Sequence, residues 1–169
     1  MGGLDLDDAL WNSMWNIHGM AHVGAARAVV HEMVGRGGGF FMVTASAAGL
    51  LATPEALIYT VTKHAAVALA EQLAFSYKRF GIRVSALCPM AVATPMVDQF
   101  AADGASAGLD GVLTAETVAT ATLAGMCAEE FFIFPHPMAG DYFAKRAARH
   151  DKWLGAMEAL QIRFADSQK

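Results

Sequence analysis

The sequence has little charge and no cluster of basic residues. Only 17% of its 169 residues are charged, and the formal net charge is −4. Proteins that bind nucleic acid usually carry a basic patch, so no nucleic-acid partner is expected. Its two cysteines, Cys88 and Cys127, do not form a CxxC pair. Both are expected to be buried thiols in a reducing compartment, which argues against a disulfide scaffold.

The sequence also has neither a leader pattern nor a long apolar run. Residues 1–10, MGGLDLDDAL, are acidic and lack the basic segment that opens a signal peptide. Leu6 stands where a myristoylation motif has Ser or Thr. The longest uncharged run, residues 37–54, is interrupted by glycines and a proline. The protein is therefore expected to be cytoplasmic, without a membrane partner.

Apolar residues, by contrast, are abundant. They make up 55% of the chain, and the mean hydropathy is +0.36. A chain of this length can bury a substantial core, so residues 1–169 are expected to form a single domain. The apolar excess predicts a large buried interface, a lipophilic pocket or a missing partner segment.

Helical and strand patterns alternate along the chain. Helices are predicted over residues 7–34, 56–79, 115–129 and 138–161, and strands over residues 40–45, 82–88 and 131–134. The first strand is apolar on both faces, as in the centre of a parallel sheet. Strands that alternate with helices of this length are typical of βαβ units. The pattern therefore predicts an α/β fold with a parallel sheet.

One segment after the first predicted strand combines a hydroxyl, a phenol and an amine. Ser46 follows the strand, and Tyr59 and Lys63 lie four residues apart on the next helix, hence on one helix face. A nearby ammonium lowers the pKa of a phenol, and a shift from about 10 to about 7 takes about 4 kcal/mol. The three groups could serve proton transfer to a substrate oxygen. The same spacing is also common on ordinary helices, where the Lys stem simply packs on the ring.

Several motifs now fall in a familiar order. They are WNIHG with Asn16, TASAAG with Ser46, YTVTK with Tyr59 and Lys63, and IRVSALCPMAVATPM over residues 82–96. In this order and spacing they resemble the short-chain dehydrogenase/reductase family over almost the entire chain. The resemblance implies a Rossmann-like doubly wound parallel sheet.

The resemblance also implies roles for four side chains. Tyr59 would be the general acid and base at the substrate oxygen. Lys63 would lower the pKa of the phenol, and Ser46 would position and polarise the carbonyl. Asn16 would hold a water in a proton relay to Lys63.

The implied cofactor is NAD or NADP. Besides Tyr59 and Lys63, which would contact the nicotinamide ribose, the backbone at Pro89 and Val92 and the hydroxyl of Thr94 would hold the nicotinamide end. The choice between the two cofactors and the direction of the reaction are not determined by the sequence.

The chain departs from the family pattern in three places. Met90 stands where the family usually has Gly, and Ser85 stands where it has Asn. The TGxxxGxG turn of the family's first βαβ unit is absent, and the glycines of residues 35–39 precede a strand instead of following one. The chain is therefore expected to be N-terminally truncated, with about three strands that correspond to strands 5, 6 and 7 of the family. Residues 40–45 would then form an open edge that pairs or aggregates.

Partners follow from the same resemblance. The two long helices at residues 7–34 and 56–79 resemble those of a family dimer interface, so a homo-oligomer is expected. A small-molecule alcohol or ketone is the expected substrate, with an apolar character suggested by Met90, Met96, Val97, Phe100, Leu109 and Leu113. His18 and His22 lie four apart without a third ligand, so no metal site is expected and a packed role is favoured.

Two functions remain open. The leading hypothesis is an NAD(P)-dependent oxidoreductase that interconverts an alcohol and a ketone. The alternative is a catalytically inactive module that oligomerises or acts as a scaffold.

Overall fold

A computed structural model describes residues 4–54, 56–97 and 110–167. Its sheet contains β1 (Gly39–Thr44), β2 (Ile82–Leu87) and β3 (Phe132–Ile133) in the order β1-β2-β3. Both strand pairs are parallel, and Gly39 pairs with Ile82 at the start of the first. The prediction of a parallel sheet with its three strands side by side is confirmed.

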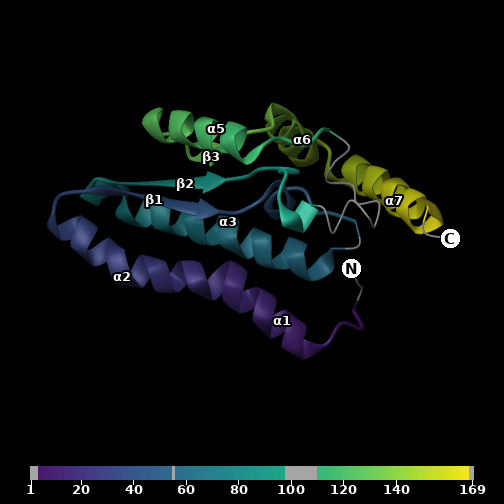
Figure 1. Ribbon diagram of the computed structural model, residues 1–169, viewed down its shortest axis with the longest axis horizontal. Helices are drawn as coiled ribbons and strands as arrows, with labels where there is room; N and C mark the ends of the chain where they lie inside the picture. Colours follow the sequence, from purple (N-terminus) through teal and green to yellow (C-terminus); the bar gives the residue numbers. More distant parts are fainter. Residues whose placement is uncertain (1–3, 55, 98–109, 168–169) are drawn as a thin grey trace.

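Helices cover both faces of this sheet (Figure 1). One face carries α2 (Ala21–Gly35) and α3 (Leu57–Tyr77), and the other carries α5 (Ala115–Cys127). The strand arrows point toward the end of the molecule where α6 (Pro137–Ala148) lies. Ligands of parallel α/β sheets bind at this carboxyl end of the strands.

The first long helix contains a turn that its sequence did not predict. α1 (Asp8–Trp15) begins where the Asp7 carboxylate accepts a hydrogen bond from the Ala9 amide at 3.0 Å. A five-residue π-helical turn, η1 (Asn16–Met20), then joins it to α2 without a break. Such wider turns are frequent at functional sites. Here the turn carries a buried histidine, His18, toward α3.

Small side chains let α3 lie close to the sheet. Ala66 and Ala70 are fully buried between the helix and the strands, beside Val67. The helix ends through η3 (Lys78–Phe80) at Gly81, whose φ of +77° is left-handed and favours glycine. This turn feeds the chain directly into β2.

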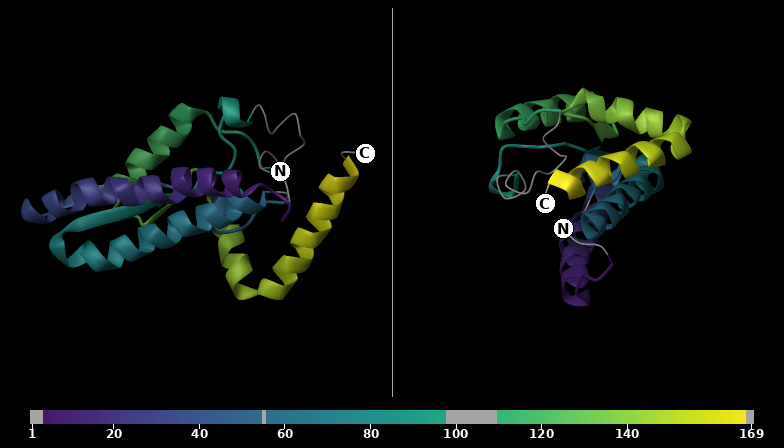
Figure 2. Two further views of the ribbon diagram at one scale, coloured as in Figure 1. Left: turned by 90° about the horizontal axis from the view of Figure 1, so that it is seen from below. Right: turned by 90° about the vertical axis from the view of Figure 1, so that its right-hand side faces the viewer.

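The predicted helix over residues 138–161 is wrong, because two helices occupy this part of the chain. α6 ends at Ala148, and α7 (His150–Ser167) follows after Arg149, whose φ of −146° and ψ of 67° are not helical. In Figure 2 the two helices form an open V. Arg146 anchors α6 to the rest of the fold by donating hydrogen bonds to the Leu50 carbonyl and, at 3.1 Å, to His64 Nε2.

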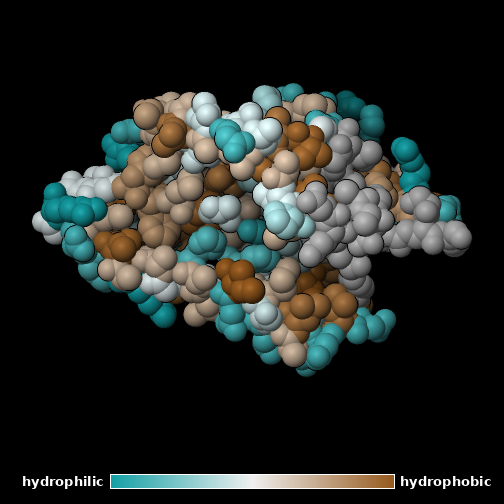
Figure 3. Space-filling model, viewed as in Figure 1, coloured by the Kyte–Doolittle hydropathy of each residue, from teal (hydrophilic) through white to brown (hydrophobic). Residues whose placement is uncertain are grey.

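Several apolar side chains of the first long helix are exposed to solvent. Leu10, Trp15 and Ile17 are 46, 45 and 59% exposed, and apolar surface is visible over α1 in Figure 3. Assembly through this helix and α3 stays a prediction. Among the described residues, no helix is long and apolar enough to cross a membrane.

Candidate active site

Ser46 lies at the carboxyl end of β1, where the chain leaves the sheet. Its side chain is 8% exposed, and its Oγ accepts a hydrogen bond from the Ala48 amide at 3.1 Å. The amide of Ala47, the residue between these two, donates to the Pro89 carbonyl at 2.9 Å. This bond ties the loop after β1 to the loop after β2, so the two segments singled out in the sequence are in contact.

Tyr59 and Lys63 share one face of α3, as their spacing predicted. The Lys63 ammonium lies 5.6 Å from the centroid of the Tyr59 ring. It also donates a hydrogen bond to the Thr44 carbonyl at 3.0 Å, at the end of β1. The amine is only 7% exposed, so it is fixed between helix and sheet.

The predicted lowering of the pKa of Tyr59 is wrong for this structure. Burial raises the pKa of the phenol above its usual value of 10.0, and the side-chain hydrogen bond with Ser46 only partly offsets this. Lys63 donates instead to a backbone carbonyl, and burial lowers its own pKa to about 8. The phenol is therefore protonated at neutral pH.

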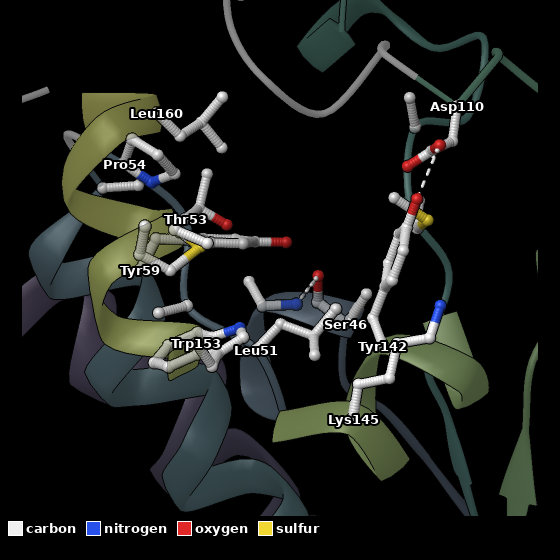
Figure 4. Close-up of a pocket in the computed structure, with 18 of the residues that line it drawn as sticks. Ser46, Leu51, Thr53, Pro54, Tyr59, Asp110, Tyr142, Lys145, Trp153 and Leu160 are labelled. Carbon is white, nitrogen blue, oxygen red and sulfur yellow. Dashed lines mark hydrogen bonds between the residues drawn. The ribbon is translucent and has the colours of Figure 1, made fainter. Parts of the chain in front are cut away.

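Ser46 and Tyr59 line a cavity of about 860 Å³ at the carboxyl ends of the strands. Figure 4 shows the phenol entering it from α3, with Trp153 of α7 on the same side and Tyr142 of α6 on the opposite side. Most of the remaining lining is apolar: Ala47, Ala48, Leu51, Ala52, Pro54, Ala56, Met90, Ala91, Met96, Val97, Ala148, Ala156, Met157 and Leu160. The cavity thus places two hydroxyls against walls suited to an apolar molecule.

The residues expected at the substrate divide into three groups. Met90, Met96 and Val97 line the cavity, as an apolar substrate site requires. Leu113 is not among the lining residues and instead pairs with Val92 in a short parallel bridge. Phe100 and Leu109 lie outside the described residues.

The residues expected to hold the cofactor, Pro89, Val92 and Thr94, are not among the lining residues, although their loop contributes Met90 and Ala91 to the cavity. Pro89 follows β2, and its carbonyl accepts the bond from Ala47 already described. The Thr94 hydroxyl donates to the Val92 carbonyl at 3.2 Å, which holds this loop in a tight turn. Asn16, the first residue of the π-helical turn, has an exposed side chain and is also not among the lining residues.

Several site residues were not found from the sequence. The Tyr142 hydroxyl donates to an Asp110 carboxylate oxygen at 3.0 Å, and both residues line the cavity. The Met90 amide donates to Nδ1 of the buried His136 at 3.2 Å. That bond leaves Nε2 with the ring proton, and Nε2 has no partner among the described residues. No spacing rule could have joined such distant residues, although the FPHP segment around His136 is an unusual strand end.

His18 packs directly against the Tyr59 ring. The two rings meet edge to face, with centroids 5.3 Å apart. Thr62 Oγ1 donates its proton to the Ile58 carbonyl at 2.8 Å, so His18 Nδ1 must donate to Thr62 at 2.9 Å. Burial first, and then the charge of Lys63, lowers the pKa of His18 to about 4. A neutral imidazole thus supports the phenol, in agreement with a packed role.

A family comparison decides where this chain belongs. The model of the short chain dehydrogenase family matches residues 3–105, which is more than half of the chain. The chain belongs to this family. The match contains the Ser46, Tyr59 and Lys63 segment and ends before α6 and α7.

Curated relatives of this family member carry oxidoreductase or dehydrogenase names. An NAD-dependent oxidoreductase of Mycobacterium tuberculosis is 39% identical over 56% of this chain and 34% of its own length. The 1-deoxy-11-beta-hydroxypentalenate dehydrogenase of Streptomyces exfoliatus is 33% identical over 72% of this chain and 44% of its own length. The chain therefore spans less than half the length of these relatives.

Solved short-chain dehydrogenases share the fold. One from Burkholderia phymatum, in complex with NAD, aligns with a TM-score of 0.70 at 28% identity over 83% of this chain and 58% of its own. Another from Streptomyces avermitilis aligns with a TM-score of 0.76 over 94% of this chain and 65% of its own, and its 19% identity supports the fold alone. The Rossmann-like assignment is confirmed.

Proposed function

We propose that the protein is an NAD- or NADP-dependent oxidoreductase that interconverts an alcohol and a ketone, with Tyr59 as general acid and base. One observation carries the proposal. The Tyr59 phenol and the Ser46 hydroxyl line the same apolar cavity at the carboxyl ends of parallel strands. A carbonyl oxygen that enters this cavity meets two hydroxyl donors at once.

The proton roles follow from the bonds that these side chains already make. Ser46 Oγ accepts from the Ala48 amide, so its own proton is left to donate, to the Tyr59 oxygen or to a substrate oxygen that takes its place. Tyr59 keeps its proton at neutral pH because burial raises its pKa. In ketone reduction the phenol therefore donates its proton to the carbonyl oxygen, and in alcohol oxidation the phenolate takes it back.

The proposal assigns the polar groups beside the cavity to the nicotinamide end of a dinucleotide. Lys63 carries an ammonium below pH about 8, at the carboxyl end of β1. We assign Lys63, with the Tyr59 hydroxyl, to the ribose, and the Pro89 and Val92 backbone with the Thr94 hydroxyl to the nicotinamide. When bound, the nicotinamide supplies or accepts the hydride. The Mycobacterium tuberculosis relative is named as NAD-dependent, which supports this class of cofactor.

Asn16 is proposed to act at a distance from the cavity. It opens the π-helical turn that carries His18 against Thr62. Its proposed task is to hold a water that passes protons to Lys63. The exposed Asn16 side chain leaves room for that water.

A second candidate function is an inactive module that oligomerises through its long helices. The exposed Trp15 and Ile17 on the first of these helices favour it. The two candidates differ in cofactor binding and turnover, so one pair of measurements separates them.

The test uses the longest natural form of the protein, since the chain spans 34 to 44% of the length of the relatives named above. Calorimetric titration with NADH and NADPH is expected to give binding heat with at least one of them. A panel of apolar ketones is then expected to oxidise that cofactor. If neither cofactor binds and the protein is a stable oligomer, the scaffold function is correct instead.

A further inference from the structure

The lining of the cavity is basic as well as apolar. Three basic side chains line it beside the apolar wall of α7, namely Lys145, Arg149 and Lys152. Among the described lining residues Asp110 is the single acid, and its carboxylate already accepts the Tyr142 hydroxyl at 3.0 Å. The described lining therefore carries an excess of positive charge, although the whole chain has a net charge of −4.

None of these three cations forms an ion pair with another described residue. The ion pairs of Arg36 with Glu32 and of Arg83 with Glu129 involve no residue of the described cavity lining. Lys145 lies over the Tyr142 ring at 5.7 Å, which leaves its ammonium protons unpaired. The neighbouring Arg146, in contrast, is held by backbone and histidine acceptors.

The geometry points to a substrate with two parts. We infer that the cavity takes an apolar alcohol or ketone that carries an anionic group, a carboxylate or a phosphate, bound by Arg149 and Lys152. The apolar body would lie against Trp153, Met157 and Leu160, and the reacting oxygen would meet Ser46 and Tyr59. This inference rests on the proposed function in taking the cavity as the site of an alcohol or ketone, whereas the preference for an anion can be measured without turnover.

Trp153 offers a readout that needs neither cofactor nor turnover. It lines the cavity and is labelled beside the phenol in Figure 4, whereas Trp11 and Trp15 are not lining residues. Its fluorescence is therefore expected to change when a ligand enters. The Trp153→Phe variant identifies the part of the signal that comes from this side chain.

The binding test compares chains of equal length with different heads. Decanoate, decanamide and decylamine are titrated into the 169-residue protein below their aggregation concentrations at low ionic strength. Decanoate is expected to bind about five- to tenfold more tightly than decanamide, which corresponds to about 1 to 1.4 kcal/mol from the two exposed cations together. Decylamine is expected to bind most weakly. Decyl phosphate is titrated in the same series. The tighter binder of decanoate and decyl phosphate shows whether the anionic group of the substrate is a carboxylate or a phosphate.

Charge reversal at the rim supplies the matched control. Lys152→Glu, alone and with Arg149→Glu, is expected to abolish the preference for decanoate over decanamide. Arg163→Glu lies on the same helix outside the lining and is expected to leave the preference unchanged. In the unaltered protein the preference should also fall as salt is added, which requires no variant to fold.

The outcomes separate this inference from the proposed function. Equal binding of decanoate and decanamide, failure of every probe to bind, or a preference that survives charge reversal and salt would overturn the inference. A preference that obeys these tests supports it even if ketone turnover fails, and that failure would count against the oxidoreductase proposal alone.

Discussion

Two regions that meet at the cavity differ in how their side chains are held. The α3 region, defined by Ser46, Tyr59 and Lys63, is built into the fold, since Lys63 is 7% exposed and bonds to the backbone of β1. The C-terminal wall, defined by α6 and α7, presents exposed cations and a half-buried Trp153 to the same space.

The difference indicates that the two regions have separate roles. The family model matches the α3 region and ends before the C-terminal wall begins. Side chains that are buried and bonded to the backbone keep one geometry, which proton transfer requires. Side chains on an exposed wall can change without unfolding the core. We therefore assign the reaction to the α3 region and the choice of substrate to the C-terminal wall.

The largest effect is expected at Lys63, where stability and activity should change in opposite directions. Burial lowers the pKa of this amine from 10.5 to about 8, which corresponds to roughly 3 kcal/mol against its charged form. Lys63→Met removes the charge and loses a hydrogen bond of about 1 kcal/mol. Thermal unfolding at pH 7 is expected to show a gain of about 1 to 2 kcal/mol, while ketone turnover falls at least hundredfold.

The pH dependence sharpens this prediction. The folded pKa of Lys63 lies below the unfolded value, so the wild type carries the full penalty below pH 8 and becomes more stable between about pH 8 and 10.5. The advantage of Lys63→Met should shrink over the same range. Lys78→Met, at an exposed position in η3, is the control and should change neither property. A loss of stability in Lys63→Met at pH 7 would refute the argument.

A pair of glycines tests the packing of the two regions. A Cβ on Gly49 would lie 2.6 Å from the Lys63 carbonyl oxygen, whereas nothing lies within 4 Å of a Cβ on Gly155 in α7. Gly49→Ala is expected to destabilise the protein by about 3 kcal/mol, since backbone must move. Gly155→Ala is expected to stabilise it by about 0.5 to 1 kcal/mol through helix propensity. Chemical denaturation measures both, and similar values for the two variants would contradict the contrast.

An effect confined to low pH is expected on the acid side of the stability curve. The folded pKa of His18, about 4, lies below the ordinary 6.5, so the folded state resists protonation and loses stability as the pH falls through this range. The loss should reach about 3 kcal/mol near pH 4. His18→Gln should be less sensitive to acid, and His31→Gln, at an exposed position on α2, should behave like the wild type. Equal acid sensitivity in all three proteins would show that His18 is not responsible.

The sequence predicted the regular part of the fold well because local patterns determine it. Alternating apolar strands and helices gave the parallel sheet, and the spacing of Tyr59 and Lys63 gave their shared helix face. The break between α6 and α7 was not predicted, since it falls at Arg149 without a glycine or proline to signal it.

The electrostatics of the site could not be predicted in the same way. The pKa of Tyr59 depends on how deeply the surrounding segments bury it, and these come from distant parts of the chain. The pairs Asp110 with Tyr142 and Met90 with His136 likewise join residues that are more than thirty positions apart. Such contacts depend on tertiary packing, which sequence spacing does not encode.

We propose that the Tyr59 phenol, and not merely any phenol in the cavity, transfers the proton. Tyr142 is the matched control, because it also lines the cavity but belongs to the C-terminal wall. Single-turnover rates of ketone reduction should fall by about 10² to 10⁴ in Tyr59→Phe and change less than fivefold in Tyr142→Phe, with cofactor binding retained in both. Equal rates in Tyr59→Phe and the wild type would contradict the account.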